Sequence, residues 1–280
     1  MRELTNNEKL ERLFRYYEYL VDEFKKNPKP LYDTREAGNR NEIRYRLFEY
    51  MTSLYGVDGF PTIVSDEEYN DINCPVYYHG YKDYDHGANF LVHHNYHRGE
   101  GVDGDGFYVA TNKSQAYRYT KIDNIHNKSE WDMGKVLEVK FQGKKRMLDL
   151  HLKNLAFVVG EGEKVTEDEA TEEEVEKINE LYSYLKTTSA SEDVKKGFLK
   201  TIWMNESLLA IYLGADYIEV YDRDFNLSHL VILNRGKVVV KESEKNRFCG
   251  KSKHYKSGAY DYKDRDFDDG WKINHEIENC

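Results

Sequence analysis

Hydrophobic residues recur at three- and four-residue steps in two segments near the N-terminus, a spacing that places one face of a helix against a core. In the first segment, residues 7–26, the repeating positions are Leu10, Leu13, Phe14, Tyr17, Leu20, Val21 and Phe24. Residues 41–55 repeat the pattern, and Pro28 and Pro30 separate the two segments. The sequence therefore predicts a helical N-terminal extension, which we assign to residues 1–70.

Shorter alternating or apolar segments follow and predict strands. These segments are 75–80, 106–111, 135–141, 146–150, 213–218 and 230–235. Helices are expected over 113–119 and 198–213, together with a short helix whose N-cap is Ser65 and whose capping-box partner is Glu68. The mixture predicts an α+β protein.

The remaining organisation follows from charge and composition. The acidic stretch 161–176 contains three consecutive glutamates and predicts a solvated helical insertion near residues 160–200 of a catalytic domain that spans 71–244. Residues 245–280 are rich in Gly, Lys, Asp and Tyr without periodicity, so they are expected to form a polar C-terminal tail.

Overall composition narrows the class of protein. No run of eighteen apolar residues occurs in the 280-residue chain, and the first residues are charged, so we expect neither a membrane segment nor a secretory leader. Three widely spaced cysteines favour reduced thiols and a cytoplasmic location. The net charge of -10 argues against a broad basic surface for nucleic acid.

Two motifs are the candidates for chemistry. The first is Tyr77-Tyr78-His79-Gly80, and the second runs from Gly104-Asp105-Gly106-Phe107-Tyr108 through the small residue Ala110 to Tyr119, eleven positions after Tyr108. In this order and spacing they resemble the NAD-binding core of ADP-ribosyltransferases of the diphtheria-toxin and poly(ADP-ribose)-polymerase type. The resemblance implies a split two-sheet ADP-ribosyltransferase core and NAD as the substrate.

The resemblance also implies a role for each motif residue. Gly80 has no side chain, so its backbone N–H and C=O can approach the nicotinamide carboxamide. Tyr108 and Tyr119 would stack on the two faces of the nicotinamide ring, with Ala110 lining the same site. His79 would hydrogen-bond a ribose hydroxyl and orient the dinucleotide without acting as a base.

The third catalytic position departs from the family pattern. Related proteins place a Glu at the start of a late strand, and the alignment puts His229 there, next to Ser228. Three interpretations stay open: His229 or Ser228 substitutes by hydrogen bonding, Glu219 on the preceding strand supplies the carboxylate, or the protein binds NAD without transfer chemistry. If the third catalytic position carries no carboxylate, we expect the product to be a single ADP-ribose unit and not a polymer.

The implied function is transfer of ADP-ribose from NAD to a macromolecular acceptor, protein or nucleic acid, as in a bacterial or phage-encoded toxin that a neutralising antitoxin would oppose. An NAD glycohydrolase and a non-catalytic NAD-sensing module are the alternatives. We expect no metal, because His93, His94 and His97 lack partners at fixed spacing and Asp103 and Asp105 lack the remaining ligands of a calcium loop.

Overall fold

The computed structural model describes residues 4–26, 35–81, 105–118, 135–160 and 170–243. The helices are α1 (Asn6–Lys26), α2 (Arg35–Leu54), α3 (Asp66–Asp71), α4 (Lys113–Arg118), α5 (Asp149–Gly160), α6 (Glu172–Thr187), α7 (Glu192–Trp203) and α8 (Glu206–Leu213). The strands are β1 (Thr62–Val64), β2 (Val76–Tyr81), β3 (Phe107–Ala110), β4 (Lys135–Phe141), β5 (Arg146–Leu148), β6 (Tyr217–Tyr221), β7 (Leu227–Ile232) and β8 (Val238–Lys241). The predicted α+β class is confirmed.

The strands form one mixed sheet in the order β1-β8-β4-β2-β3-β7-β6-β5. Its two edge pairs, β1 with β8 and β5 with β6, are parallel, and the other pairs are antiparallel. Strand β2 pairs with β4 along its whole length, whereas in the described part of the chain its register with β3 consists of the single pair Tyr78↔Ala110. The sheet is thus two four-stranded halves that meet at one rung.

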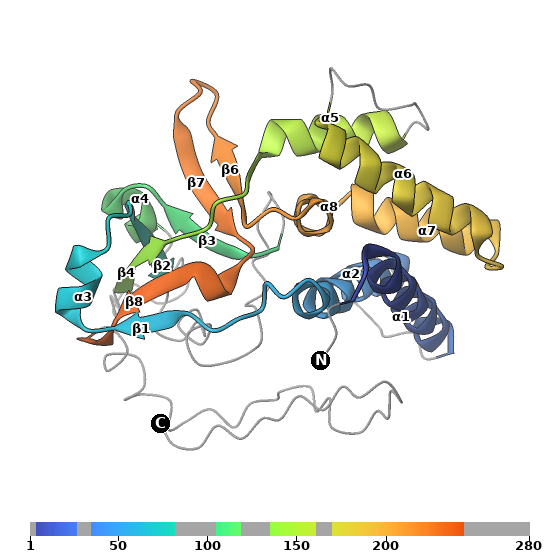
Figure 1. The fold of residues 1–280 in the computed structure, drawn as a ribbon, viewed down its shortest axis with the longest axis horizontal. Coiled ribbons are helices and arrows are strands. Elements are labelled where there is room, and N and C mark those ends of the chain that lie inside the picture. The colour runs from blue at the N-terminus through green and yellow to red at the C-terminus, as the bar shows by residue number, and fades with distance from the viewer. Residues whose placement is uncertain (1–3, 27–34, 82–104, 119–134, 161–169, 244–280) are drawn as a thin grey trace, which may run out of the picture.

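The sheet bends so strongly that its two halves face each other. The rings of Phe141 on β4 and Tyr217 on β6 are 5.2 Å apart, although three strands separate β4 from β6 in the sheet. In Figure 1, β6 and β7 run steeply away from the direction of β1 and β8. We call the concave surface, which carries Phe141 and Tyr217, the inner face, and the opposite surface the outer face.

Side chains on the inner face form the core of the sheet. Because successive residues of a strand point to opposite faces and directly paired residues share a face, the register assigns each position. The inner-face residues are buried and apolar along four strands: Leu137, Val139, Phe107, Val109, Leu230, Ile232, Val238 and Val240. Their burial holds the two halves together.

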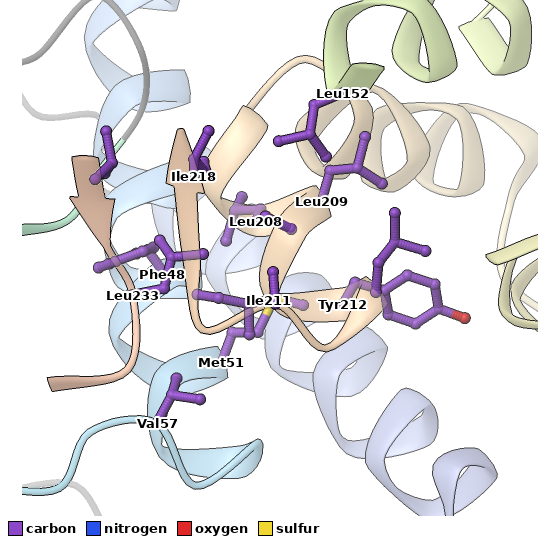
Figure 2. Packing of buried hydrophobic residues seen from close by; sticks show 14 of the residues in the cluster. Phe48, Met51, Val57, Leu152, Leu208, Leu209, Ile211, Tyr212, Ile218 and Leu233 are labelled. Atoms are coloured by element: carbon purple, nitrogen blue, oxygen red, sulfur yellow. The ribbon is translucent and has the colours of Figure 1, made fainter. Parts of the chain in front are cut away.

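A layer of helices covers one end of the sheet and shares its core. Helix α1 packs against α7 through Phe14, whose ring is 5.1 Å from that of Phe198 in an edge-on arrangement. Helix α8 is buried on all sides, and Figure 2 shows Leu208 and Leu209 beside Ile218 of β6 and Leu152 of α5. One continuous cluster of buried residues therefore joins the N-terminal helices, the sheet and α5–α8.

Several details differ from the sequence predictions. The strands expected over 213–218 and 230–235 are β6, which begins at Tyr217, and β7, which ends at Ile232. The strand expected over 146–150 ends at Leu148, where α5 begins, and the helix expected over 198–213 is two helices, α7 and α8. Helices α6 and α7, within the expected insertion, bury apolar residues such as Leu181 and Phe198 in the common core. The capping box of Ser65 and Glu68 is confirmed at the start of α3.

Candidate functional site

The two sequence motifs lie on neighbouring strands at the junction of the two sheet halves. His79 and Gly80 are on β2, and Tyr108 and Ala110 are on β3. The antiparallel register that pairs Tyr78 with Ala110, continued by two residues, would pair Gly80 with Tyr108. The described register does not include that rung. The described β2–β3 ladder therefore has no backbone rung at Gly80.

The His79 side chain hydrogen-bonds the backbone carbonyl of Tyr108, which a continued β2–β3 ladder would use. Its Nδ1 lies 2.7 Å from the backbone oxygen of Tyr108. Because a carbonyl oxygen only accepts, Nδ1 carries the proton and donates it, and Nε2 is an acceptor in the neutral ring. The imidazole thereby ties β2 to β3 with its tautomer fixed.

The ring of His79 lies on the inner face, against Phe107. The two ring centroids are 4.5 Å apart and the planes are tilted by 41°. Phe107 is buried, whereas His79 is half-buried. The preceding Gly106, at φ +156°, leaves no space for a side chain, since an added Cβ would lie 2.6 Å from a methyl carbon of Val231. This glycine lets β3 begin in close contact with β7.

Tyr108 points to the outer face, where it meets His229. The two rings stack, with centroids 5.4 Å apart and an interplanar angle of 30°. The register explains the contact: Ala110 pairs with His229 and Tyr108 with Val231, so Tyr108 and His229 are diagonal neighbours on one face. The fold thus brings together two predicted site residues that are 121 positions apart in the chain.

Helix α4 is fixed beside this stack by polar contacts. The side-chain oxygen of Asn112 accepts the backbone N–H of Gln115 at 2.8 Å, and the Gln115 amide donates to Ser228 Oγ at 3.2 Å. Ser228 Oγ in turn lies 3.1 Å from His229 Nδ1. Gln115 is therefore a site residue that the motif analysis missed, because its role depends on a partner more than a hundred residues away.

Glu219 lies on the inner face, away from the Tyr108–His229 stack. Its directly paired residue is Leu230, one position from His229, so the pleat sends the two candidates for the third catalytic position to opposite faces. Glu219 is 8% exposed, and its carboxylate accepts a hydrogen bond from the Tyr221 hydroxyl at 2.9 Å and lies 3.5 Å from the Arg146 guanidinium.

The tyrosines around Glu219 respond to its negative charge. The hydrogen bond to Glu219 raises the pKa of Tyr221, and burial adds to the rise. Burial raises the pKa of Tyr77 on β2, and the charge of Glu219 raises it further. Each phenol therefore stays protonated at neutral pH and can donate. The inner face thus carries a buried carboxylate that accepts a hydrogen bond from the Tyr221 hydroxyl and raises the pKa of Tyr77.

Some predicted site residues lie outside the part of the chain that the structure describes. Tyr119, expected to complete the nicotinamide sandwich, follows the last described residue of α4. The residues that are not expected to form a metal site, His93, His94, His97 and Asp103, fall in the undescribed range 82–104. Ala110 is buried next to the Tyr108–His229 stack. Among the described residues, no group of three or more potential ligands could hold a metal ion.

Comparisons with protein-family models, with curated proteins and with solved structures each found no match. Within the described ranges, no helix combines the length and the apolar character required to cross a membrane. The chemistry of the site is therefore inferred from its own residues and their geometry.

Proposed function

We propose that this protein is a mono-ADP-ribosyltransferase that transfers ADP-ribose from NAD to a macromolecular acceptor and releases nicotinamide. The observation that carries the proposal is the juxtaposition of the three motif strands. The Tyr-His-Gly strand β2, the Gly-Phe-Tyr strand β3 and the late strand β7 with His229 are consecutive in the sheet. Strands this far apart in the sequence have no local reason to be neighbours.

The opening between β2 and β3 supports an NAD site at the junction. Gly80 brings no side chain of its own to the junction, and it lies opposite Tyr108, where the described register has no rung. The ring of Tyr108 provides a stacking surface for nicotinamide, with Tyr119 as the expected second surface. The bend of the sheet at this junction also agrees with the split two-sheet core that the resemblance implies.

The reaction breaks the bond between the nicotinamide nitrogen and C1′ of its ribose. The bonding electron pair leaves with nicotinamide, and the cation-like ribose is attacked at C1′ by an acceptor nucleophile, which loses its proton. His229 would hold a ribose hydroxyl by a hydrogen bond, and Ser228 next to it would share this role. Without a carboxylate at this position the acceptor ribose is not activated for elongation, so the product is a single ADP-ribose unit.

Glu219 is the alternative third residue. It is the buried carboxylate on a strand next to β7, and a negative charge stabilises an oxocarbenium-like cation better than a neutral imidazole does. Its position on the inner face requires the ribose to enter between the sheet halves, on the side of His79 and away from the Tyr108 ring.

The test is nicotinamide release measured by chromatography, with NAD alone, with added protein and with added nucleic acid. Transfer predicts that a labelled adenine moiety of NAD becomes attached to an acceptor. Release without any labelled acceptor would identify an NAD glycohydrolase. Binding of NAD without release would identify a non-catalytic sensing module, and absence of both would refute the assignment.

A further inference from the structure

Strand β7 contains a β-bulge at Ser228. The β6–β7 register pairs Val220 with His229 and Tyr221 with Leu227, which leaves Ser228 as an extra residue between two rungs. A regular ladder would pair Ser228 with Tyr221 and send its side chain to the inner face. The bulge instead lets the Ser228 hydroxyl meet the outer-face His229, with Oγ 3.1 Å from Nδ1. Bulges beside functional sites commonly redirect a side chain in this way.

Helix α4 supplies the second contact of the Ser228 hydroxyl. The side-chain amide of Gln115 donates to Ser228 Oγ at 3.2 Å. Gln115 is held in turn by Asn112, whose Oδ1 accepts the Gln115 backbone N–H at 2.8 Å and whose Nδ2 lies 3.5 Å from Gln115 Oε1. The four side chains of Asn112, Gln115, Ser228 and His229 thus form one chain of hydrogen bonds, which we call the relay.

The direction of each hydrogen bond in the relay follows from its first donor. A backbone N–H can only donate, so Asn112 Oδ1 is the acceptor and Nδ2 is the donor to Gln115 Oε1. Gln115 therefore has its Nε2 left to donate to Ser228 Oγ. Among the described residues, the acceptor within hydrogen-bond distance of the Ser228 hydroxyl is His229 Nδ1, so the hydroxyl proton is directed there.

The relay consequently selects one tautomer of His229. A nitrogen that accepts a hydrogen bond carries no proton, so the proton of the neutral ring is on Nε2. His79 has the opposite tautomer, because its Nδ1 donates to the Tyr108 carbonyl at 2.7 Å. The two histidines of the candidate site thus differ in polarity, since Nε2 of His79 can accept a hydrogen bond and Nε2 of His229 can donate one.

We propose that Gln115 and Ser228 are positioning residues that fix His229 as a hydrogen-bond donor at Nε2. The inference rests on the proposed transferase function, in which His229 holds a ribose hydroxyl. An imidazole with its proton on Nε2 orients the hydroxyl oxygen and cannot take up the hydroxyl proton there, so His229 does not act as a general base. The relay thereby explains why a second ribose would not be activated and why the product is a single ADP-ribose unit.

The first test is the tautomer itself, measured by nitrogen NMR on the isotope-labelled full chain without NAD, at a pH at which the ring is neutral. The protonated and the unprotonated nitrogen of an imidazole have well-separated chemical shifts, and the His229 signals are those missing from His229→Ala. Wild type should carry the proton on Nε2. Ser228→Ala breaks the relay and should give a mixture of tautomers, whereas Ser228→Thr keeps the hydroxyl and should keep the wild-type tautomer.

Gln115→Glu should invert the tautomer, because a carboxylate of nearly the same shape only accepts. The Ser228 hydroxyl would donate to that carboxylate, and His229 Nδ1 would carry the proton and donate to Ser228 Oγ. Nicotinamide release in a single turnover at saturating NAD should fall roughly tenfold, with the NAD dissociation constant within about twofold of wild type, since orientation is lost and contact area is kept. Gln142→Glu is the matched control at an exposed glutamine and should change neither quantity.

Each failure points to a different step. A wild-type His229 with its proton on Nδ1, or the wild-type tautomer in both Gln115→Glu and Ser228→Ala, would overturn the relay. An inverted tautomer in Gln115→Glu with nicotinamide release at the wild-type rate would overturn the positioning role. A wild-type protein that has the expected tautomer and releases no nicotinamide under any condition would overturn the transferase function itself.

Discussion

The two faces of the sheet use the same strands for different purposes. On the inner face, apolar side chains from both halves bury one another, and the buried Glu219 and the half-buried His79 are polar residues on the same face. On the outer face, Tyr108 and His229 stack beside α4 and its polar contact to Ser228. The pleat therefore divides one predicted site between two surfaces. A ligand that contacts both His79 and Tyr108 must bind at the seam between β2 and β3, where the two surfaces meet.

The largest expected effect concerns the inner face. Leu230→Ala removes a fully buried side chain between the sheet halves and should lower the free energy of unfolding by about 2–5 kcal/mol. Chemical denaturation monitored by circular dichroism measures it. The control is Leu150→Ala, at a leucine that is 53% exposed, and it should change stability by less than about 0.5 kcal/mol. Equal losses in the two variants would show that the inner face is not the core.

The third catalytic position distinguishes the two faces, because His229 lies on the outer face and Glu219 on the inner face. His229→Ala should slow nicotinamide release about 10²–10³-fold if the outer face stabilises the developing cation, and Glu219→Gln should then change it only a few-fold. Both rates are measured by single-turnover kinetics at saturating NAD. The reverse result would move the reacting ribose to the inner face. Wild-type rates in both variants would mean that other groups stabilise the cation.

Binding of NAD should depend on the outer-face ring. Tyr108→Ala removes the stacking surface and should weaken NAD binding by about 1–3 kcal/mol, measured by calorimetry. Tyr108→Phe keeps the ring and should bind with nearly wild-type affinity. A folded Tyr108→Ala protein that binds NAD as tightly as wild type would exclude the predicted nicotinamide site.

His79 should affect turnover more than affinity. An asparagine places its amide nitrogen where Nδ1 of the imidazole lies, so His79→Asn can keep the hydrogen bond to the Tyr108 carbonyl while it removes Nε2. We expect turnover roughly tenfold lower from misoriented NAD, with an unchanged melting temperature. If His79→Asn transfers at the original rate while His79→Ala loses stability, the residue serves only to join β2 and β3.

The smallest effect is expected away from both faces, in the helical layer. Nε2 of His151 on α5 lies 3.2 Å from both carboxylate oxygens of Glu174 on α6. The hydrogen bond to Glu174 raises the pKa of His151 above its usual 6.5, against the opposing effect of burial. The stabilisation is therefore complete below about pH 6.5 and is lost as the pH rises through the folded-state pKa. The melting temperature of wild type should exceed that of His151→Gln at about pH 6, and the difference should shrink at about pH 8.

Local signals predicted the elements that depend on local contacts. Helix α1 and the capping box at Ser65 follow from side-chain periodicity and from hydrogen bonds three residues apart. The break between α7 and α8 was missed although it carries a local signal, since Asn205 caps α8 by accepting the Leu208 N–H at 2.9 Å. Asn205 also donates to the buried Asp105 at 3.1 Å, and no local pattern contains that contact because it spans a hundred residues. Helix α5 was not predicted because its apolar residues are spread around the helix, so the sequence shows little amphipathic pattern there.

The sequence predicts which residues belong to the candidate site. It does not predict which of their side chains lie on the same face of the sheet. The motifs predict His79, Gly80 and Tyr108 as site residues, and the structure places their strands β2 and β3 side by side. The register between strands decides which side chains share a face, and it is set by contacts between residues far apart in the chain. In the β6–β7 pair, the register also shifts between Val220 and Tyr221. Since a slip of one residue exchanges the faces of a strand, the sequence alone could not decide between His229 and Glu219.

The single rung between β2 and β3 also has a consequence for motion. Among the described strand pairs, β2 and β3 share the fewest register pairs, so opening the sheet at this seam breaks the fewest backbone hydrogen bonds. A dinucleotide bound across it would contact Gly80 on one strand and Tyr108 on the other. Bound NAD would then link the two halves of the sheet. The junction would be rigid while NAD is bound and would open more easily again once nicotinamide has left.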